Sequence, residues 1–136
     1  SNIPNQKNVA LLLPENPSLS SKNIHRELSI RLKKEISVVI SDSMTRPYRS
    51  GVVNFALAST NLPSLKDISG KKDLFNNLLK CTEIAIADEL ASAAGLVMGQ
   101  SNEKKPVILI KGFNKESYTN FDAADLVVKE ENDLYR

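Results

Sequence analysis

The fold is decided around residues 38–51, which read Val38-Val39-Ile40-Ser41-Asp42-Ser43-Met44-Thr45-Arg46-Pro47-Tyr48-Arg49-Ser50-Gly51. The apolar run at the start predicts a buried strand from Ser37 to Ser41. We expect the polar residues that follow to form a loop where this strand leaves the interior. A carboxylate beside a hydroxyl, as in Asp42 and Ser43, can ligate a hard cation. The guanidinium groups of Arg46 and Arg49 can hold phosphate or carboxylate.

Outward from this segment, hydrophobic periodicity predicts both strands and helices. A helix capped by Ser18 or Ser20 carries apolar residues every fourth position, at Ile24, Leu28 and Leu32. The other expected elements are strands at 9–13, 52–58 and 106–110, an irregular stretch at 61–77, a helix over about 78–98 and a packed tail at 122–136. The strand–helix–strand order of the first half is compatible with a parallel crossover. We therefore predict an α/β (mixed α+β) fold, a mixed sheet flanked by helices.

Composition narrows the class of protein. The length of 136 residues predicts one domain, 1–136, and a hydrophobic content of 41% is enough for a core. A net charge of +2 with interspersed acids does not favour a nucleic-acid surface. The single cysteine, Cys81, excludes an internal disulfide framework. With a polar N-terminus and no run of membrane-spanning length, we expect a cytoplasmic protein.

The candidate site residues allow two interpretations each. Asp42 is either a cation ligand or a turn-capping residue paired with Arg46 or Arg49. The two arginines are either a clamp for an anionic group or ordinary surface salt-bridge partners. The polar segment 98–105 either wraps a nucleotide or is a solvated connection, and it lacks the spacing of a P-loop.

Several blocks in order resemble the coenzyme F-420 γ-glutamyl ligase family. They include Ser1 to Pro4, Val9 to Pro17, Val39 to Ser43 with Arg46-Pro47, Ala87 to Ala91, Met98-Gly99-Gln100, Lys111-Gly112 and Asp133 to Arg136. The resemblance covers nearly the whole chain, and it matches only the C-terminal half of the ligase domain. It implies an F-420 ligase-like fold that is incomplete in this chain. It also implies a missing N-terminal half of the same protein and a homodimer.

The resemblance implies a ligase that forms an amide bond between L-glutamate and a deazaflavin precursor through an acyl phosphate. GTP is the implied co-substrate, and Mg²⁺ or Mn²⁺ is the implied metal. Oxygen ligands would come from Asp42, Ser43 and Gln100, while Arg46 and Arg49 would order the loop or hold an anionic substrate. The implied nucleotide contacts are Asn2, Met98, Gly99, Gln100, Ser101, Asn102, Glu103, Lys104 and Lys105.

The sequence departs from the family pattern at several positions near the expected site. The family's Thr, Phe and Gly are Ser43, Met44 and Thr45 here, and Asn54 and Ala58 replace its usual Asp and Gly. Ser43 keeps the hydroxyl, while Thr45 could alter the loop backbone. These changes motivate an alternative: a non-catalytic or substrate-shifted nucleotide-binding homologue that acts as an assembly module.

Overall fold

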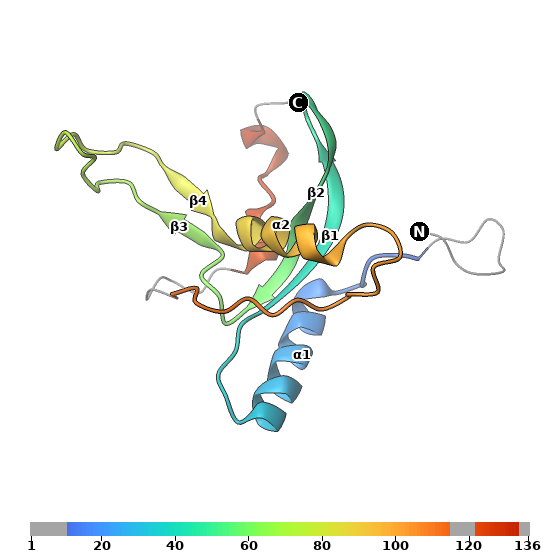
Figure 1. Ribbon diagram of the computed structural model, residues 1–136. Coiled ribbons are helices and arrows are strands. Elements are labelled where there is room, and N and C mark those ends of the chain that lie inside the picture. The colour runs from blue at the N-terminus through green and yellow to red at the C-terminus, as the bar shows by residue number, and fades with distance from the viewer. Residues whose placement is uncertain (1–10, 115–121, 134–136) are drawn as a thin grey trace.

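The computed structural model describes residues 11–114 and 122–133 (Figure 1). Its elements are α1 (Pro17–Leu32), β1 (Val38–Arg46), β2 (Arg49–Thr60), β3 (Leu65–Asp67), β4 (Glu83–Ala85), α2 (Ile86–Met98) and the 3-10 helices η1 (Ala123–Leu126) and η2 (Glu130–Asn132). This confirms the mixed α/β class. None of the helices within those ranges is long and apolar enough to cross a membrane.

The centre of the molecule is a long antiparallel ribbon of β1 and β2. Pairing runs from Val38 opposite Thr60 to Arg46 opposite Arg49, so that only Pro47 and Tyr48 lie between the two strands. The predicted loop at 41–51 is therefore wrong, and the predicted strand at 52–58 is longer than expected. Polar residues continue in β1 because one side of the ribbon faces solvent, as antiparallel sheets allow. Asp42 thus lies within a strand and not at its carboxyl end.

Helix α1 packs on the ribbon through its polar side. It begins after Asn16, whose side chain accepts a hydrogen bond from the Leu19 N–H at 2.8 Å, and not after Ser18 or Ser20 as predicted. Pro17 follows this cap, in a position where its missing N–H costs nothing. Ser21 is fully buried and its hydroxyl bonds that of Thr60 in β2.

The apolar positions of α1 are not buried in the described part of the chain. The exposed fractions of Ile24, Leu28 and Leu32 are 43%, 38% and 56%. Their spacing correctly predicted a helix, but the face that meets the ribbon carries serines. An apolar helix face normally packs against another element.

A narrow arm extends from the ribbon and consists of β3, β4 and the residues between them (Figure 1). Leu65 pairs with Ala85 and Asp67 with Glu83, and an isolated bridge joins Lys72 to Leu78. The predicted irregular stretch at 61–77 is therefore partly a strand. The predicted helix at 78–98 begins only at Ile86, because residues 83–85 pair with β3.

Helix α2 lies along β2, and its side chains bond backbone groups at the outer edge of that strand. The Asp88 carboxylate accepts a hydrogen bond from the Ala56 N–H at 2.9 Å. One helical turn later, the Ser92 hydroxyl donates to the Asn54 carbonyl at 2.8 Å. These side chains replace a neighbouring strand, which is one way in which proteins protect a sheet edge.

The other expected elements differ from the prediction. Of the first predicted strand, Val9 and Ala10 lie outside the described residues, and 11–13 form no strand. The segment 106–110 is not a strand either. Both sheets among residues 11–114 and 122–133 are antiparallel, so the parallel crossover is not found there. In the tail, Leu126 packs on the small core of Leu62, Ala87 and Ala123, whereas Leu134 lies outside the described residues.

Asp122 ties the C-terminal segment to the ribbon. Its Oδ1 accepts hydrogen bonds from the Ser59 N–H at 2.9 Å and the Ala124 N–H at 3.2 Å. Burial raises the pKa of this carboxyl, but the hydrogen bonds of Ser59, Ser18 and Ala124 and the charge of Lys22 outweigh it, so that the pKa lies below its ordinary value. The ionised form is therefore the one that the fold stabilises.

We expect Asp122→Ala to lower the free energy of unfolding at pH 7 by about 1–2 kcal/mol, the usual range for hydrogen bonds to a charged group near the surface. Because the pKa is depressed in the folded state, this contribution is complete above the ordinary pKa of about 4 and is lost as the pH falls through the folded value. Urea unfolding of wild type and variant should therefore converge as the pH falls below the depressed pKa of Asp122 in the folded state. Asp125→Ala, which removes an exposed carboxylate from the same short helix, is the control and should leave stability nearly unchanged.

Candidate functional site

The Ser43 backbone N–H and the Asp42 carboxylate lie at the edge of β1 that faces away from β2. Since Asn54 and Ala56 direct their backbone groups toward α2, the Ser43–Asn54 pair is a non-hydrogen-bonded one, and the Ser43 N–H points to the outer edge of β1. That N–H donates to Asp42 Oδ1 at 2.7 Å. The Asp42 carboxylate, which is exposed, therefore lies at this edge, where no described strand pairs with β1.

The Ser43 side chain faces the other way from that of Asp42 and lies on the side of the ribbon that α2 covers. Directly opposite residues of an antiparallel pair share a face, and Ser43 lies opposite Asn54. The Asn54 side chain meets α2 so closely that a Cβ added at Gly95 would lie 2.8 Å from Asn54 Cγ. Ser43, Asn54 and the end of α2 are thus neighbours.

Gln100 joins this group from the loop after α2. Its Nε2 donates to Asn54 Oδ1 at 2.8 Å, and the Asn54 Nδ2 lies 3.9 Å from the Met98 sulfur. Asn54 is only 6% exposed, whereas Gln100 is exposed. Two of the three predicted metal ligands, Ser43 and Gln100, therefore lie on one face of the ribbon, each next to Asn54.

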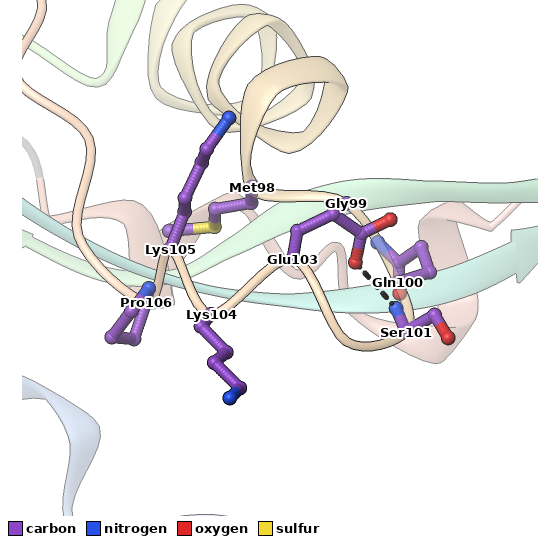
Figure 2. A pocket seen from close by; sticks show the side chains of 8 residues that line it. All are labelled: Met98, Gly99, Gln100, Ser101, Glu103, Lys104, Lys105 and Pro106. Carbon is purple, nitrogen blue, oxygen red and sulfur yellow. Dashed lines mark hydrogen bonds between the residues drawn. The ribbon is translucent and has the colours of Figure 1, made fainter.

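The predicted nucleotide segment lines a shallow pocket of about 610 Å³ (Figure 2). Its lining residues are Met98, Gly99, Gln100, Ser101, Glu103, Lys104, Lys105 and Pro106. The predicted contact residue Asn102 belongs to the same exposed loop but does not line the pocket. The pocket is wide open to solvent.

Glu103 organises the pocket loop. Its carboxylate accepts a hydrogen bond from the Ser101 N–H at 2.9 Å and lies over Gly99, as Figure 2 shows. The backbone hydrogen bonds from Ser101 and from its own N–H, with the charge of Lys105, lower the pKa of Glu103. The glutamate is therefore ionised at neutral pH and holds the turn closed.

The two lysines of the loop extend in different directions from the pocket (Figure 2). Lys104 has a backbone φ of +56°, which is uncommon for a residue with a side chain. This turn separates the side chains of the two neighbouring residues, and their ammonium groups diverge. Both residues are exposed.

Arg46 and Arg49 lie at the end of the ribbon, apart from the pocket. They are opposite each other across the turn, and Arg46 Nη1 donates to the Gly51 carbonyl at 3.4 Å. The Cα atoms of Ser43 and Arg46 are about 10 Å apart, since a strand rises about 3.3 Å per residue. In the described part of the chain, neither arginine pairs with Asp42, so the salt-bridge interpretation of that carboxylate is not found.

The donor chemistry fits a hard cation. Carboxylate, hydroxyl and amide oxygens are the ligands that Mg²⁺ and Mn²⁺ prefer. Asp42 carries the first kind, Ser43 the second and Gln100 the third, with the Asp42 side chain on the opposite face of the ribbon from the other two. Within residues 11–114 and 122–133, no cluster of three or more His, Cys, Asp or Glu side chains is present that could hold a metal. The described residues therefore supply some of the oxygen ligands that such a cation needs.

The structure thus groups Ser43, Gln100 and the pocket loop, and it separates the two arginines from them. Asn2, predicted as a nucleotide contact, lies outside the described residues. Sequence reasoning missed Gly95, whose lack of a side chain lets α2 approach β2 at Asn54. A glycine inside an alanine-rich helix was the available signal, because such a glycine costs helix stability and often has a packing reason.

Thr45 lies in β1 and not in a loop, at a point where the strand pairing is irregular. The register of β1 on β2 shifts between Met44 and Arg46. Thr45 is not among the described residues with positive φ. That threonine alters the backbone at this position stays a prediction.

Comparison with known proteins identifies the family. Residues 1–112 match the F-420-0:gamma-glutamyl ligase family. The chain is 43% identical over 125 residues to the coenzyme F-420:L-glutamate ligase of Methanocaldococcus jannaschii, covering 92% of this chain and 50% of that protein. It is 41% identical over 124 residues to the ligase of the same name from Methanococcus maripaludis, covering 91% and 50%.

A third relative, the coenzyme F-420:L-glutamate ligase of Methanothermobacter thermautotrophicus, is 41% identical over 105 residues, which is 77% of this chain and 42% of the relative. The chain spans about half the length of the curated relatives that it matches. The family match covers the ribbon, both α-helices and the pocket loop, which together carry the site described above. The chain therefore belongs to the F-420-0:gamma-glutamyl ligase family.

Proposed function

We propose that this chain forms the GTP- and cation-binding part of a γ-glutamyl ligase that joins L-glutamate to a deazaflavin precursor of coenzyme F-420. The observation that carries the proposal is the meeting of Ser43, Asn54 and Gln100 beside the pocket of residues 98–106. Family membership supports the ligase chemistry. Because the relatives are about twice as long, the complete activity requires the rest of the ligase domain.

In this proposal the pocket loop holds the GTP phosphates. Lys104 and Lys105 supply charge, and the backbone N–H groups of the loop supply donors for phosphate oxygens. Glu103 cannot bind phosphate directly, because its ionised carboxylate would repel it. Its role is to fix the loop through Ser101.

Mg²⁺ or Mn²⁺ would be held at the outer edge of β1, where the Asp42 carboxylate, bonded to the Ser43 N–H, would reach round from the face of the ribbon opposite to that of Ser43 and Gln100, which would supply the other oxygens. When bound, the cation would offset the charge on the transferring phosphoryl group. Asp42 contributes a full negative charge and is oriented by the Ser43 N–H. Ser43 and Gln100 contribute neutral oxygens, which leave a net positive field for phosphate.

Arg46 and Arg49 would attract the anionic substrates to the ribbon. Arg46 and Arg49 are directly opposite each other in the strand pairing across the turn, and no described carboxylate neutralises them. Like charges placed directly opposite each other destabilise a strand pair, which favours binding of an anion between them. The precursor carboxylate that becomes the acyl phosphate, or the L-glutamate that supplies the attacking amine, would provide such an anion.

The exposed apolar side of α1 supports the need for the rest of the ligase. Leu19, Ile24 and Leu28 are 53%, 43% and 38% exposed, and Val107 and Leu109 are 81% and 74% exposed. Surfaces of this kind usually mark contacts with other protein. We propose that the rest of the ligase domain, or a second copy in a homodimer, covers them.

Asp42→Asn is expected to weaken Mn²⁺-dependent GTP binding at least tenfold in the complete ligase, because the substitution removes a charge and keeps the shape. Stability should change little, since Asp42 is exposed. Calorimetric titration of GTP in the presence of Mn²⁺, with GDP release that depends on glutamate and precursor, measures the effect.

The matched control is Asp67→Asn. Asp67 is also an exposed strand aspartate whose Oδ1 accepts from a nearby backbone N–H, that of Ser69 at 2.7 Å, but it lies in the arm. It should leave GTP binding unchanged. Equal binding by wild type and Asp42→Asn would contradict the ligand role, and absence of glutamate-dependent turnover in an otherwise GTP-binding protein would favour the assembly-module alternative.

A further inference from the structure

We propose that Asn54 is a positioning residue that fixes the orientation of the Gln100 side chain, so that the Gln100 carbonyl oxygen faces the cation. The inference rests on the proposed function, because it takes Gln100 as a cation ligand. Asn54, in β2, would act through Gln100 and would not itself touch the substrate. A flexible, exposed amide is thereby held in one of its two orientations.

Asn54 is held firmly enough to act as an anchor. It is 6% exposed and lies in the middle of β2, where its backbone carbonyl accepts from the Ser92 hydroxyl. Gly95 closes over its side chain, and its Nδ2 faces the Met98 sulfur. With the amide nitrogen directed at Met98, the Oδ1 atom is directed at the pocket loop.

Gln100 needs such an anchor because its side chain is exposed and carries a donor and an acceptor of nearly equal size. The Nε2 donates to Asn54 Oδ1 at 2.8 Å, which leaves Oε1 directed away from Asn54. Among the described residues, no donor occupies that oxygen. Only an oxygen can ligate a hard cation, so the hydrogen bond selects the useful orientation.

The position of Ser43 makes the selection relevant to the site. Ser43 lies directly opposite Asn54, and its side chain shares the face on which Gln100 is bound. Asn54 is therefore a neighbour of both residues that supply neutral oxygen ligands. A carboxamide at this position joins the β1–β2 ribbon to the loop after α2.

The alternative is a purely structural role, in which Asn54 only fills the space between β2 and α2. That interpretation predicts that any residue of similar volume will serve. The positioning role predicts that an acceptor is required. Leucine and aspartate both keep the branched, four-heavy-atom side chain of asparagine, and they differ in this respect: leucine cannot accept from Gln100 Nε2, whereas aspartate can.

The test uses the complete ligase and measures Mn²⁺ affinity at fixed GTP, by calorimetry and by the electron paramagnetic resonance of free Mn²⁺. Asn54→Leu should weaken Mn²⁺ binding about fivefold, the factor that corresponds to one hydrogen bond of about 1 kcal/mol. Asn54→Asp should bind Mn²⁺ at least as well as wild type. In a Gln100→Ala background, Asn54→Leu should cause no further loss.

A second readout does not depend on metal or activity. In the nitrogen-15 spectrum of the complete ligase, the Gln100 side-chain NH₂ resonances should move toward random-coil values in Asn54→Leu and stay in place in Asn54→Asp. Ser92→Ala is the structural control, because it removes a hydrogen bond to the Asn54 backbone and leaves the acceptor for Gln100. It should lower thermal stability and leave Mn²⁺ affinity unchanged. If Asn54→Leu does not fold, Asn54→Ala takes its place.

The outcomes separate the two hypotheses. If Gln100→Ala weakens Mn²⁺ binding but Asn54→Leu does not, the positioning role is overturned while the proposed function stands. If Ser92→Ala weakens Mn²⁺ binding as much as Asn54→Leu, the effect is structural and the role is again overturned. If wild type binds no Mn²⁺ with GTP, the proposed function fails and this inference fails with it.

Discussion

Gly95→Ala is expected to lower the free energy of unfolding by about 1–3 kcal/mol, the usual cost of overpacking a closely packed site. The added Cβ would lie 2.8 Å from Asn54 Cγ, 2.9 Å from Oδ1 and 3.2 Å from Cβ. The Asn54 side chain is short and nearly buried, so it cannot rotate away cheaply. Either α2 moves off β2 or Asn54 releases Gln100. Chemical denaturation of the protein measures the cost.

The sign of this effect should reverse when Asn54 is removed. Alanine is a better helix former than glycine by about 0.5–1 kcal/mol, and only the contact with Asn54 prevents that gain. In an Asn54→Gly background, we therefore expect Gly95→Ala to be neutral or stabilising. The intrinsic cost of glycine in β2 is common to both arms of this double-mutant cycle and cancels. A loss of the same size in both backgrounds would show that the close approach at Asn54 is not the cause.

Local patterns predicted helices better than they predicted the ribbon. The α1 segment shows apolar spacing and a nearby cap, and both are properties of adjacent residues. The hairpin of β1 and β2 depends on pairing between residues far apart, such as Val38 and Thr60. Polar residues at 41–51 suggested a loop because nothing local shows that they will pair. The same limit explains why α2 begins only at Ile86. Residues 83–85 pair with β3, at 65–67, and no pattern near 83–85 shows this distant partner.

The candidate site was only partly accessible from the sequence. The pocket loop could be predicted, since residues 98–106 are contiguous and line one pocket. Asn54 stood out only as a departure from the family pattern, because its hydrogen bond to Gln100 spans 46 positions of the chain. The separation of Arg46 and Arg49 from the pocket could not be predicted either, since it follows from the length of the ribbon. Non-local register therefore decides which of the candidate residues can act together.

Gly99→Ala is expected to damage the pocket directly. Gly99 ends α2 with φ +75° and ψ −178°, a region of backbone conformation that is essentially restricted to glycine. A side chain there costs about 1–3 kcal/mol of strain. An added Cβ would also overlap the Glu103 carboxylate, which would have to leave the Ser101 N–H. We expect GTP affinity of the complete ligase to fall at least tenfold and stability to fall by the strain.

Gly70→Ala is the matched control for strain alone. Gly70 has a similar φ of +78°, but no atom lies within 4 Å of an added Cβ, and the residue belongs to the arm. It should lower stability and leave GTP binding intact. Combining Gly99→Ala with Glu103→Ala relieves the overlap but not the strain, so it should recover little GTP affinity, because both the backbone angle and the closed turn are then lost. Unchanged GTP affinity in Gly99→Ala would show that the nucleotide binds elsewhere, since this substitution deforms the pocket loop without adding or removing a charge.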